Sequence, residues 1–97
     1  MKKTTKKAKD ILIGQKLFVR TVTYHAVGRV IRRAVEFGPR FVEMEGASWI
    51  ADSGRFMQAI EDGTLAEVEP IRARYYVNLD TAVDVIEWKH PLPEEQK

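Results

Sequence analysis

Basic and aromatic side chains form the clearest candidate for binding chemistry in this sequence. Guanidinium groups grip phosphates through paired hydrogen bonds, and aromatic rings stack on nucleotide bases. The candidate ligand-binding residues are Arg20, Tyr24, His25, Arg29, Arg33, Trp49 and Arg55. They predict a nucleotide-like anionic ligand. The competing interpretation is a solvated strand surface whose arginines pair with acidic side chains, namely Glu43, Glu45, Glu67 and Glu69.

The segment around Trp49 allows two interpretations. Residues 46–51 are expected to lead into the helix that follows, with Asp52 or Ser53 as its N-cap. Trp49 then fills the core, whereas in a ligand site it forms a stacking wall and Arg55 contacts a phosphate. Trp88, at the end of the last expected strand, is a candidate for a subunit interface.

Residues for catalysis or metal binding lack the spacing that these functions require. The only two histidines, His25 and His90, are far apart and form no metal-binding pair, and Ser48 and Ser53 lie outside any nucleophile motif. The chain has no cysteine and no phosphate-binding glycine motif. We therefore predict a protein that is not an enzyme, with no catalytic residue, no metal site and no cofactor.

Short strands are the elements that must position these side chains. Apolar and β-branched residues alternate over 17–24, 27–35, 41–45, 65–68, 75–79 and 82–88, with Gly28 at a bulge or close approach and Pro70 at a strand end. A single short helix, of about nine residues, ends at Gly63. The predicted fold class is mainly β: a small SH3-like or Sm-like barrel of five or six antiparallel strands with one short helix. A two-layer α+β sheet is the alternative.

Charge is divided unequally along the 97 residues. Residues 1–40 hold eleven basic and two acidic side chains, a net charge of +9, whereas residues 41–97 have a net charge of −7. The halves can pair within the chain, assemble copies head to tail, or present the basic half to an anionic partner. With aromatic residues on a small domain, this asymmetry predicts a homo-oligomer.

Composition predicts one domain between two polar ends. Residues 1–10 form a Lys-rich flexible arm, residues 11–90 a single β-rich domain, and residues 91–97 a C-terminal tail. The arm is either a solubilising tail or a contact to phosphate. No apolar run reaches the roughly 20 residues of a membrane span, and no secretory signal is recognisable. We expect a cytoplasmic protein with no membrane partner.

Two stretches, VRTVTYHAVGRV and GASWIADSGRFMQAIEDGTLAEVEP, resemble a group of small uncharacterised bacteriophage and prophage proteins. The resemblance continues through VNLDTAVDVIEWKHPLP, of which VNLDTAVDVIEW is also similar to the closing strands of Sm-like ring proteins. It implies a phage context and a β-rich domain, and it assigns no catalytic residue.

Three functions agree with these patterns. The first is a non-catalytic phage-type binding protein in the host cytoplasm, such as an anti-defence factor that sequesters a nucleotide-like signal or blocks a host protein. The second is a virion structural component, a decoration or connector subunit. The third is a regulator that binds nucleic acid weakly and without sequence specificity.

Overall fold

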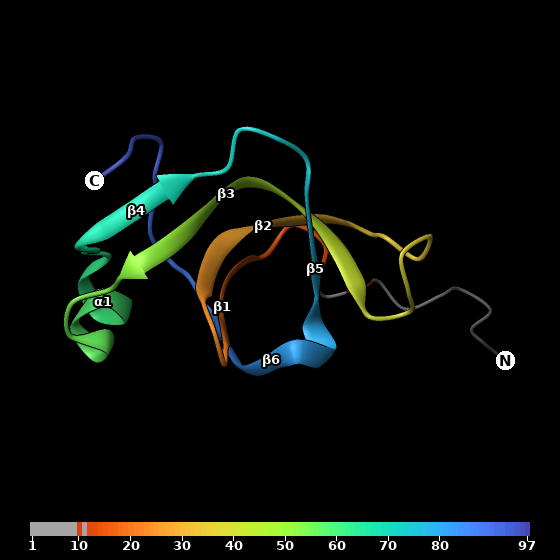
Figure 1. The fold of residues 1–97 in the computed structure, drawn as a ribbon, viewed down its shortest axis with the longest axis horizontal. Coiled ribbons are helices and arrows are strands. Elements are labelled where there is room, and N and C mark those ends of the chain that lie inside the picture. Colours follow the sequence, from red (N-terminus) through yellow and green to blue (C-terminus); the bar gives the residue numbers. More distant parts are fainter. Residues whose placement is uncertain (1–9, 11) are drawn as a thin grey trace, which may run out of the picture.

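Six strands and a short α-helix follow one another in the computed structural model, which describes residue 10 and residues 12–97 (Figure 1). The elements are β1 (Lys16–Thr21), β2 (His25–Arg33), β3 (Phe41–Asp52), α1 (Phe56–Asp62), β4 (Glu67–Pro70), β5 (Tyr75–Asn78), the 3₁₀-helix η1 (Leu79–Thr81) and β6 (Ala82–Glu87). The predicted mainly β class with a single short helix is confirmed. Of the expected Lys-rich arm, all but Asp10 lies outside the described residues.

All six strands belong to one antiparallel sheet. Five of them are neighbours in the order β4-β3-β2-β1-β6, and β5 pairs with β3 outside this series. The 12-residue β3 pairs with β5 over residues 41–44 and with β4 over residues 48–52. Figure 1 shows the sheet strongly bent, with β5 and η1 carrying the chain across to β6. No ladder joins β5 to β6 within the described residues, so the predicted barrel closure is wrong: the sheet bends but stays open.

Apolar clusters cover both faces of the sheet, because alternate residues of a strand project to opposite sides. One cluster is formed by the buried residues Leu17, Val19, Val30, Val42, Met44, Ala47 and Val77. The other is formed by Phe18, Val27, Ile50, Ala59, Leu65, Val68 and Trp88, with Phe56, Ile60 and Leu92 packed against it. Helix α1 and the segment after β6 therefore cover the second face. This explains why β1 is apolar on both sides.

Gly28 marks a close approach between β2 and β3, as predicted. A Cβ at this position would lie 3.0 Å from the Cβ of Ala47 and 3.0 Å from the sulfur of Met44. The register of the β2–β3 ladder also shifts between Val27 and Arg29. The absence of a side chain at Gly28 thus lets the two central strands pack closely at the bend.

Helix α1 is shorter than the predicted one and begins differently. Its N-cap is Arg55, which makes no side-chain capping hydrogen bond. The predicted capping by Asp52 or Ser53 is wrong, because β3 extends through residues 46–51 to Asp52, whose carboxylate accepts a hydrogen bond from the Gly54 amide at 2.8 Å. The predicted C-cap is confirmed: Gly63 has a φ of 76° and its N–H donates to the Ala59 carbonyl.

Residues 91–97, the expected tail, pack along the fold. Backbone hydrogen bonds of 2.9 and 3.1 Å join Lys97 to Val68, so the end of the chain lies along the outer edge of β4. Trp88 donates to the Pro91 carbonyl at 3.2 Å, and Leu92 packs into the second cluster. Within the described part of the chain, no helix is long and apolar enough to span a membrane.

Candidate functional site

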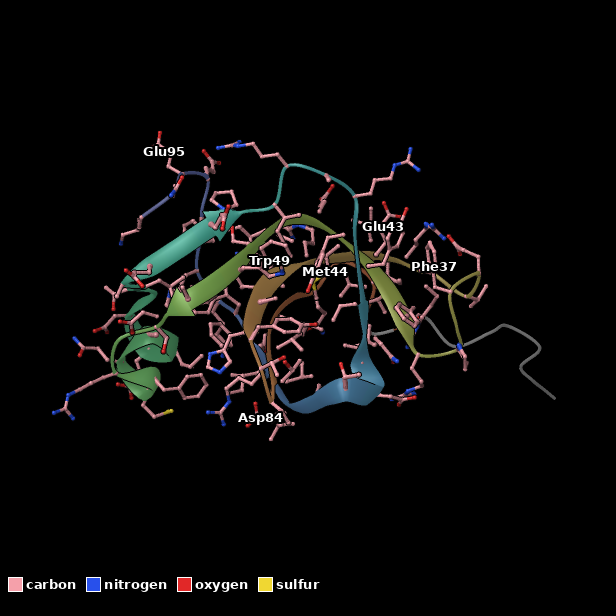
Figure 2. All side chains as sticks on the ribbon, in the orientation of Figure 1. Phe37, Glu43, Met44, Trp49, Asp84 and Glu95 are labelled. Carbon is pink, nitrogen blue, oxygen red and sulfur yellow. The ribbon has the colours of Figure 1, made fainter. Side chains whose placement is uncertain are left out.

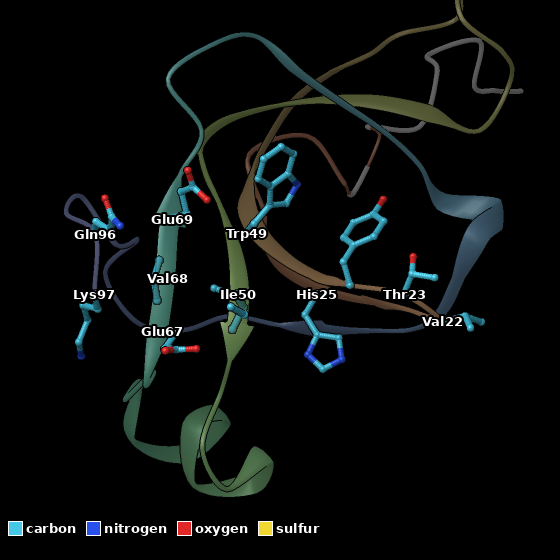
Figure 3. A pocket seen from close by; sticks show the side chains of 12 residues that line it. Val22, Thr23, His25, Trp49, Ile50, Glu67, Val68, Glu69, Gln96 and Lys97 are labelled. Atoms are coloured by element: carbon cyan, nitrogen blue, oxygen red, sulfur yellow. The ribbon is translucent and has the colours of Figure 1, made fainter.

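Four aromatic residues line a surface hollow of about 350 Å³. They are Tyr24, Trp49, Tyr75 and Tyr76. Beside it lies a second hollow of about 600 Å³, which shares Tyr24 and Trp49 and extends past Glu67 and Glu69 to Lys97 (Figure 3). We call the two hollows together the aromatic pocket. It combines aromatic rings with carboxylates, which is a pattern of ligand sites rather than of bare strand surface.

Strand alternation turns Trp49 toward this pocket. Its neighbour Ile50 is buried in the second cluster, so Trp49 projects from the opposite face of β3 and is 46% exposed. Directly opposing residues of antiparallel strands share a face, and Trp49 opposes Ala26 on β2 and Glu69 on β4. The small, buried Ala26 leaves room for the indole, and Glu69 lies beside it.

The Trp49 and Tyr75 rings meet edge to face, with centroids 6.3 Å apart and planes at 89°. Burial raises the pKa of Tyr75, and the neighbouring Tyr24 phenol raises it further. Tyr75 therefore keeps its proton throughout the physiological range. The pocket accordingly presents neutral rings set at right angles, with tyrosine hydroxyl groups near them.

His25 is among the residues that line the wider hollow, although its ring lies on the other face of the sheet from Trp49. Figure 3 shows its ring directed away from Trp49. Its centroid is 5.7 Å from that of Phe18 and 6.4 Å from that of Phe56, on the side of the sheet covered by α1. Of the predicted site residues, the structure thus brings Tyr24 and Trp49 together and directs His25 to the opposite face.

The predicted arginines of the strands, Arg20, Arg29 and Arg33, lie in ion pairs away from the pocket. Arg20 donates from Nε to Asp84 at 2.8 Å and also pairs with it through Nη2, while its guanidinium lies 4.0 Å from the Phe56 ring centroid. Asp84 is well separated from Trp49 in Figure 2. The hydrogen bonds between the two side chains raise the pKa of Arg20 and lower the pKa of Asp84.

The other strand arginines are also paired. Arg33 donates to Asp10 at 2.7 Å, and Arg29 lies 3.7 Å from Glu45. The further pairs join Arg32 to Glu36 and Glu43, and Arg40 to Asp80. Arg55 is exposed at the start of α1. The interpretation of the strand arginines as partners of carboxylates in the same chain is supported for Glu43 and Glu45, and Asp10, Glu36, Asp80 and Asp84 are further partners. Among the described residues, Glu67 and Glu69 are not paired with an arginine, contrary to the prediction.

The structure excludes the core interpretation of Trp49 and the interface interpretation of Trp88 within the chain described. Trp49 was expected in the core and is nearly half exposed, because β3 continues through it and its face is not covered by α1. Trp88 was a candidate for a subunit interface and is only 1% exposed, packed against Phe18 and His90. The exposed tryptophan is therefore Trp49, which leaves it available to a ligand.

Most residues that line the pocket were not among the predicted site residues, and the aromatic and acidic ones among them are Glu67, Glu69, Tyr75 and Tyr76. The sequence signal that could have identified Tyr75 and Tyr76 is their adjacency on a short predicted strand. Among the residues with described positions, no group of three or more His, Asp or Glu side chains is arranged to hold a metal ion.

Comparisons with protein-family models, with curated proteins and with solved structures find no match to this chain. Its function must therefore be inferred from the geometry of the aromatic pocket.

Proposed function

We propose that this chain is a non-catalytic binding protein and that the aromatic pocket is its binding site. The observation that supports this most is the convergence of Tyr24, Trp49 and the Tyr75–Tyr76 pair from separate segments of the chain. Exposed aromatic side chains gathered around a hollow are typical of ligand and partner sites. Strand alternation accounts for the direction of the Trp49 ring, and the fold brings the four aromatic residues together.

The resemblance to phage proteins supports an action in the cytoplasm of an infected cell, as an anti-defence factor. Such a factor can sequester a nucleotide-like signal, whose base would stack on Trp49, or block a host protein. The pairing of Arg20, Arg29 and Arg33 with carboxylates leaves these guanidinium groups less available to a phosphate. This charge arrangement favours the second action, the capture of a group on a host protein.

Tryptophan fluorescence tests the location of the site. The chain has two tryptophans, and Trp88 is buried, so an accessible quencher such as acrylamide reports on Trp49. Candidate ligands, including AMP and basic peptides, should protect Trp49 from quenching in a saturable way. Because Trp49→Leu removes the reporter, binding by the variants is measured by isothermal titration calorimetry. Trp49→Leu should abolish binding, whereas Met57→Ala, which changes an exposed side chain on α1, should leave it intact. A ligand that binds Trp49→Leu with unchanged affinity would place the site elsewhere.

Assembly into a larger structure, such as a virion component, is the second candidate function. It is favoured by β6, which is an edge strand of the sheet with Val83 65% exposed and Val85 41% exposed. Exposed apolar edge strands promote pairing between chains. Light scattering at two salt concentrations should then show a homo-oligomer that Val85→Lys dissociates. A strict monomer at high protein concentration would remove this candidate.

A further inference from the structure

We propose that the group recognised by the aromatic pocket is an organic cation, an alkylated ammonium, rather than an anion. This inference rests on the proposed function, because it names the ligand class of the same pocket. It follows from the orientation of the rings, the carboxylates beside them, and the pairing of the arginines elsewhere.

The ring arrangement suits a compact cation. Trp49 and Tyr75 lie at 89° to each other, so a ligand between them meets the face of one ring and lies near the other. The face of an aromatic ring carries the negative end of its quadrupole and attracts ammonium groups, and tryptophan attracts them most strongly. A hollow of about 350 Å³ has room for such a group. Two rings at right angles do not offer the parallel walls that would sandwich a flat base.

Carboxylates beside the rings add negative charge, which attracts a cation. Glu69 opposes Trp49 across the β3–β4 ladder, and Glu67 projects from the same side of β4 two residues earlier. Neither has an ion-pair partner within 4.0 Å among the residues that the structure describes, and the ion pairs of these residues involve elements other than β4. The one basic residue lining the wider hollow is Lys97, on the far side of β4 from Trp49 in Figure 3.

An anionic ligand would be repelled by the charges around this pocket. A phosphate in this pocket would approach Glu67 and Glu69, which repel it. The strand arginines Arg20, Arg29 and Arg33 are held by Asp84, Glu45 and Asp10. The charges therefore discriminate against phosphate and in favour of ammonium.

Choline and its neutral isostere 3,3-dimethylbutan-1-ol provide a matched pair of probes, since they have nearly the same shape and differ in charge. Each is titrated into the full chain at low salt, and Trp49 quenching is followed as above. We expect choline to bind at least about fivefold more tightly than the alcohol, a difference in the range of a cation–π contact. AMP should bind more weakly than choline, and a peptide containing trimethyllysine should compete with choline.

Glu69→Gln tests the carboxylate without changing its size. It should reduce the preference for choline over the alcohol, whereas Glu61→Gln, on the exposed side of α1, should not change it. The melting temperature of both variants is measured beside binding. A loss of preference in Glu69→Gln with unchanged melting supports the proposal.

Three results would overturn it in distinguishable ways. Equal binding of choline and the alcohol would show a purely apolar pocket, and tighter binding of AMP would show a nucleotide site; both outcomes reject the cation and retain the binding function. If neither probe, AMP nor the peptide changes the quenching of Trp49, the aromatic pocket is not a binding site and both proposals fail.

Discussion

The two tryptophans occupy opposite environments and should have opposite effects when removed. Trp88 is 1% exposed, donates a hydrogen bond to the Pro91 carbonyl, and packs against Phe18 at a centroid distance of 5.7 Å. Trp49 is 46% exposed and contacts Tyr75 edge to face. We therefore expect Trp88 to contribute to stability and Trp49 to the proposed binding.

Trp88→Ala should lower the free energy of unfolding by roughly 3–5 kcal/mol, because it removes a large ring from a packed cluster and leaves a cavity. Trp49→Ala should lower it by less than about 1 kcal/mol, as substitutions at exposed positions do. Urea unfolding followed by circular dichroism measures both values. A Trp49→Ala variant as destabilised as Trp88→Ala would show that Trp49 is a structural residue and would weaken the assignment of the pocket.

Helix α1 depends on tertiary contacts because it is short and its N-terminus is uncapped. Only Ala59 within it is buried, and Phe56 and Ile60 pack against the second cluster. At its C-terminal end His90 contacts the Ile60 carbonyl through Nε2 at 2.7 Å and lies against Gly63. The segment after β6 thus holds the helix in place, which places the end of the chain among the determinants of the fold.

Gly63→Ala should destabilise the protein by more than Gly54→Ala. Both glycines have positive φ values, 76° and 72°, so each substitution carries a conformational penalty of about 1–2 kcal/mol. A Cβ at Gly63 would also lie 2.6 Å from Cγ of His90, whereas at Gly54 it would meet nothing within 4 Å. Thermal melting of the two variants isolates the steric contribution. Equal melting temperatures would mean that His90 moves freely away from the helix.

Arg55→Ser should stabilise the chain by about 0.5–1 kcal/mol, because it supplies the side-chain acceptor that the N-cap of α1 lacks. Arg72→Ser, an exchange at an exposed loop position, is the matched control and should have little effect. The same pair shows whether Arg55 contributes to binding: a stabilised Arg55→Ser variant with unimpaired ligand binding would remove Arg55 from the candidate site. No gain in stability would indicate that the first amides of the helix are already satisfied.

Across the whole molecule, the basic first half and acidic second half are joined by ion pairs within the chain. Arg20, Arg29 and Arg40 pair with Asp84, Glu45 and Asp80, so strands β1 to β3 are partly neutralised by later elements. Hydrogen bonding to Arg32 lowers the pKa of Glu36 to about 2 from 4.5. Hydrogen bonds to Arg33 and Arg20 lower the pKa values of Asp10 and Asp84.

These lowered pKa values predict a loss of stability in acid. A carboxyl group with a lower pKa in the folded state binds fewer protons there than in the unfolded state, so its contribution is complete above the unfolded value. For Glu36 that contribution is lost as the pH falls from about 4.5 to about 2. Melting temperatures measured across this window should fall, and less steeply for Glu36→Gln than for the control Glu95→Gln.

High salt should reduce the acid-induced change, since these pairs are solvent-exposed and screened. A melting temperature that is independent of pH between about 5 and 2 would show that the ion pairs make no net contribution to stability.

Sequence alone was sufficient for the local features. Alternation of apolar residues predicted six strands, although not the extension of β3 through residues 46–52. Pro70 was placed at the end of β4, and Gly63 was assigned as the helix C-cap. These features depend on backbone preferences and on spacing within a few residues, which a short window of sequence contains. The prediction of one short helix in a mainly β fold succeeded for the same reason.

The aromatic pocket and the environments of the tryptophans were decided by tertiary structure. Trp49 and Ile50 are adjacent apolar residues, and only the packing of α1 and residues 88–92 against the Ile50 face makes one buried and the other exposed. Arg20 could be assigned to Asp84 only once β6 was placed beside β1, 64 positions away along the chain. Tyr24, Trp49 and Tyr75 likewise meet because a bent, open sheet brings a turn, β3 and β5 together. The periodicity of a strand shows which residues share a face of the sheet. Which of the two faces is exposed to water depends on the elements that pack against each one.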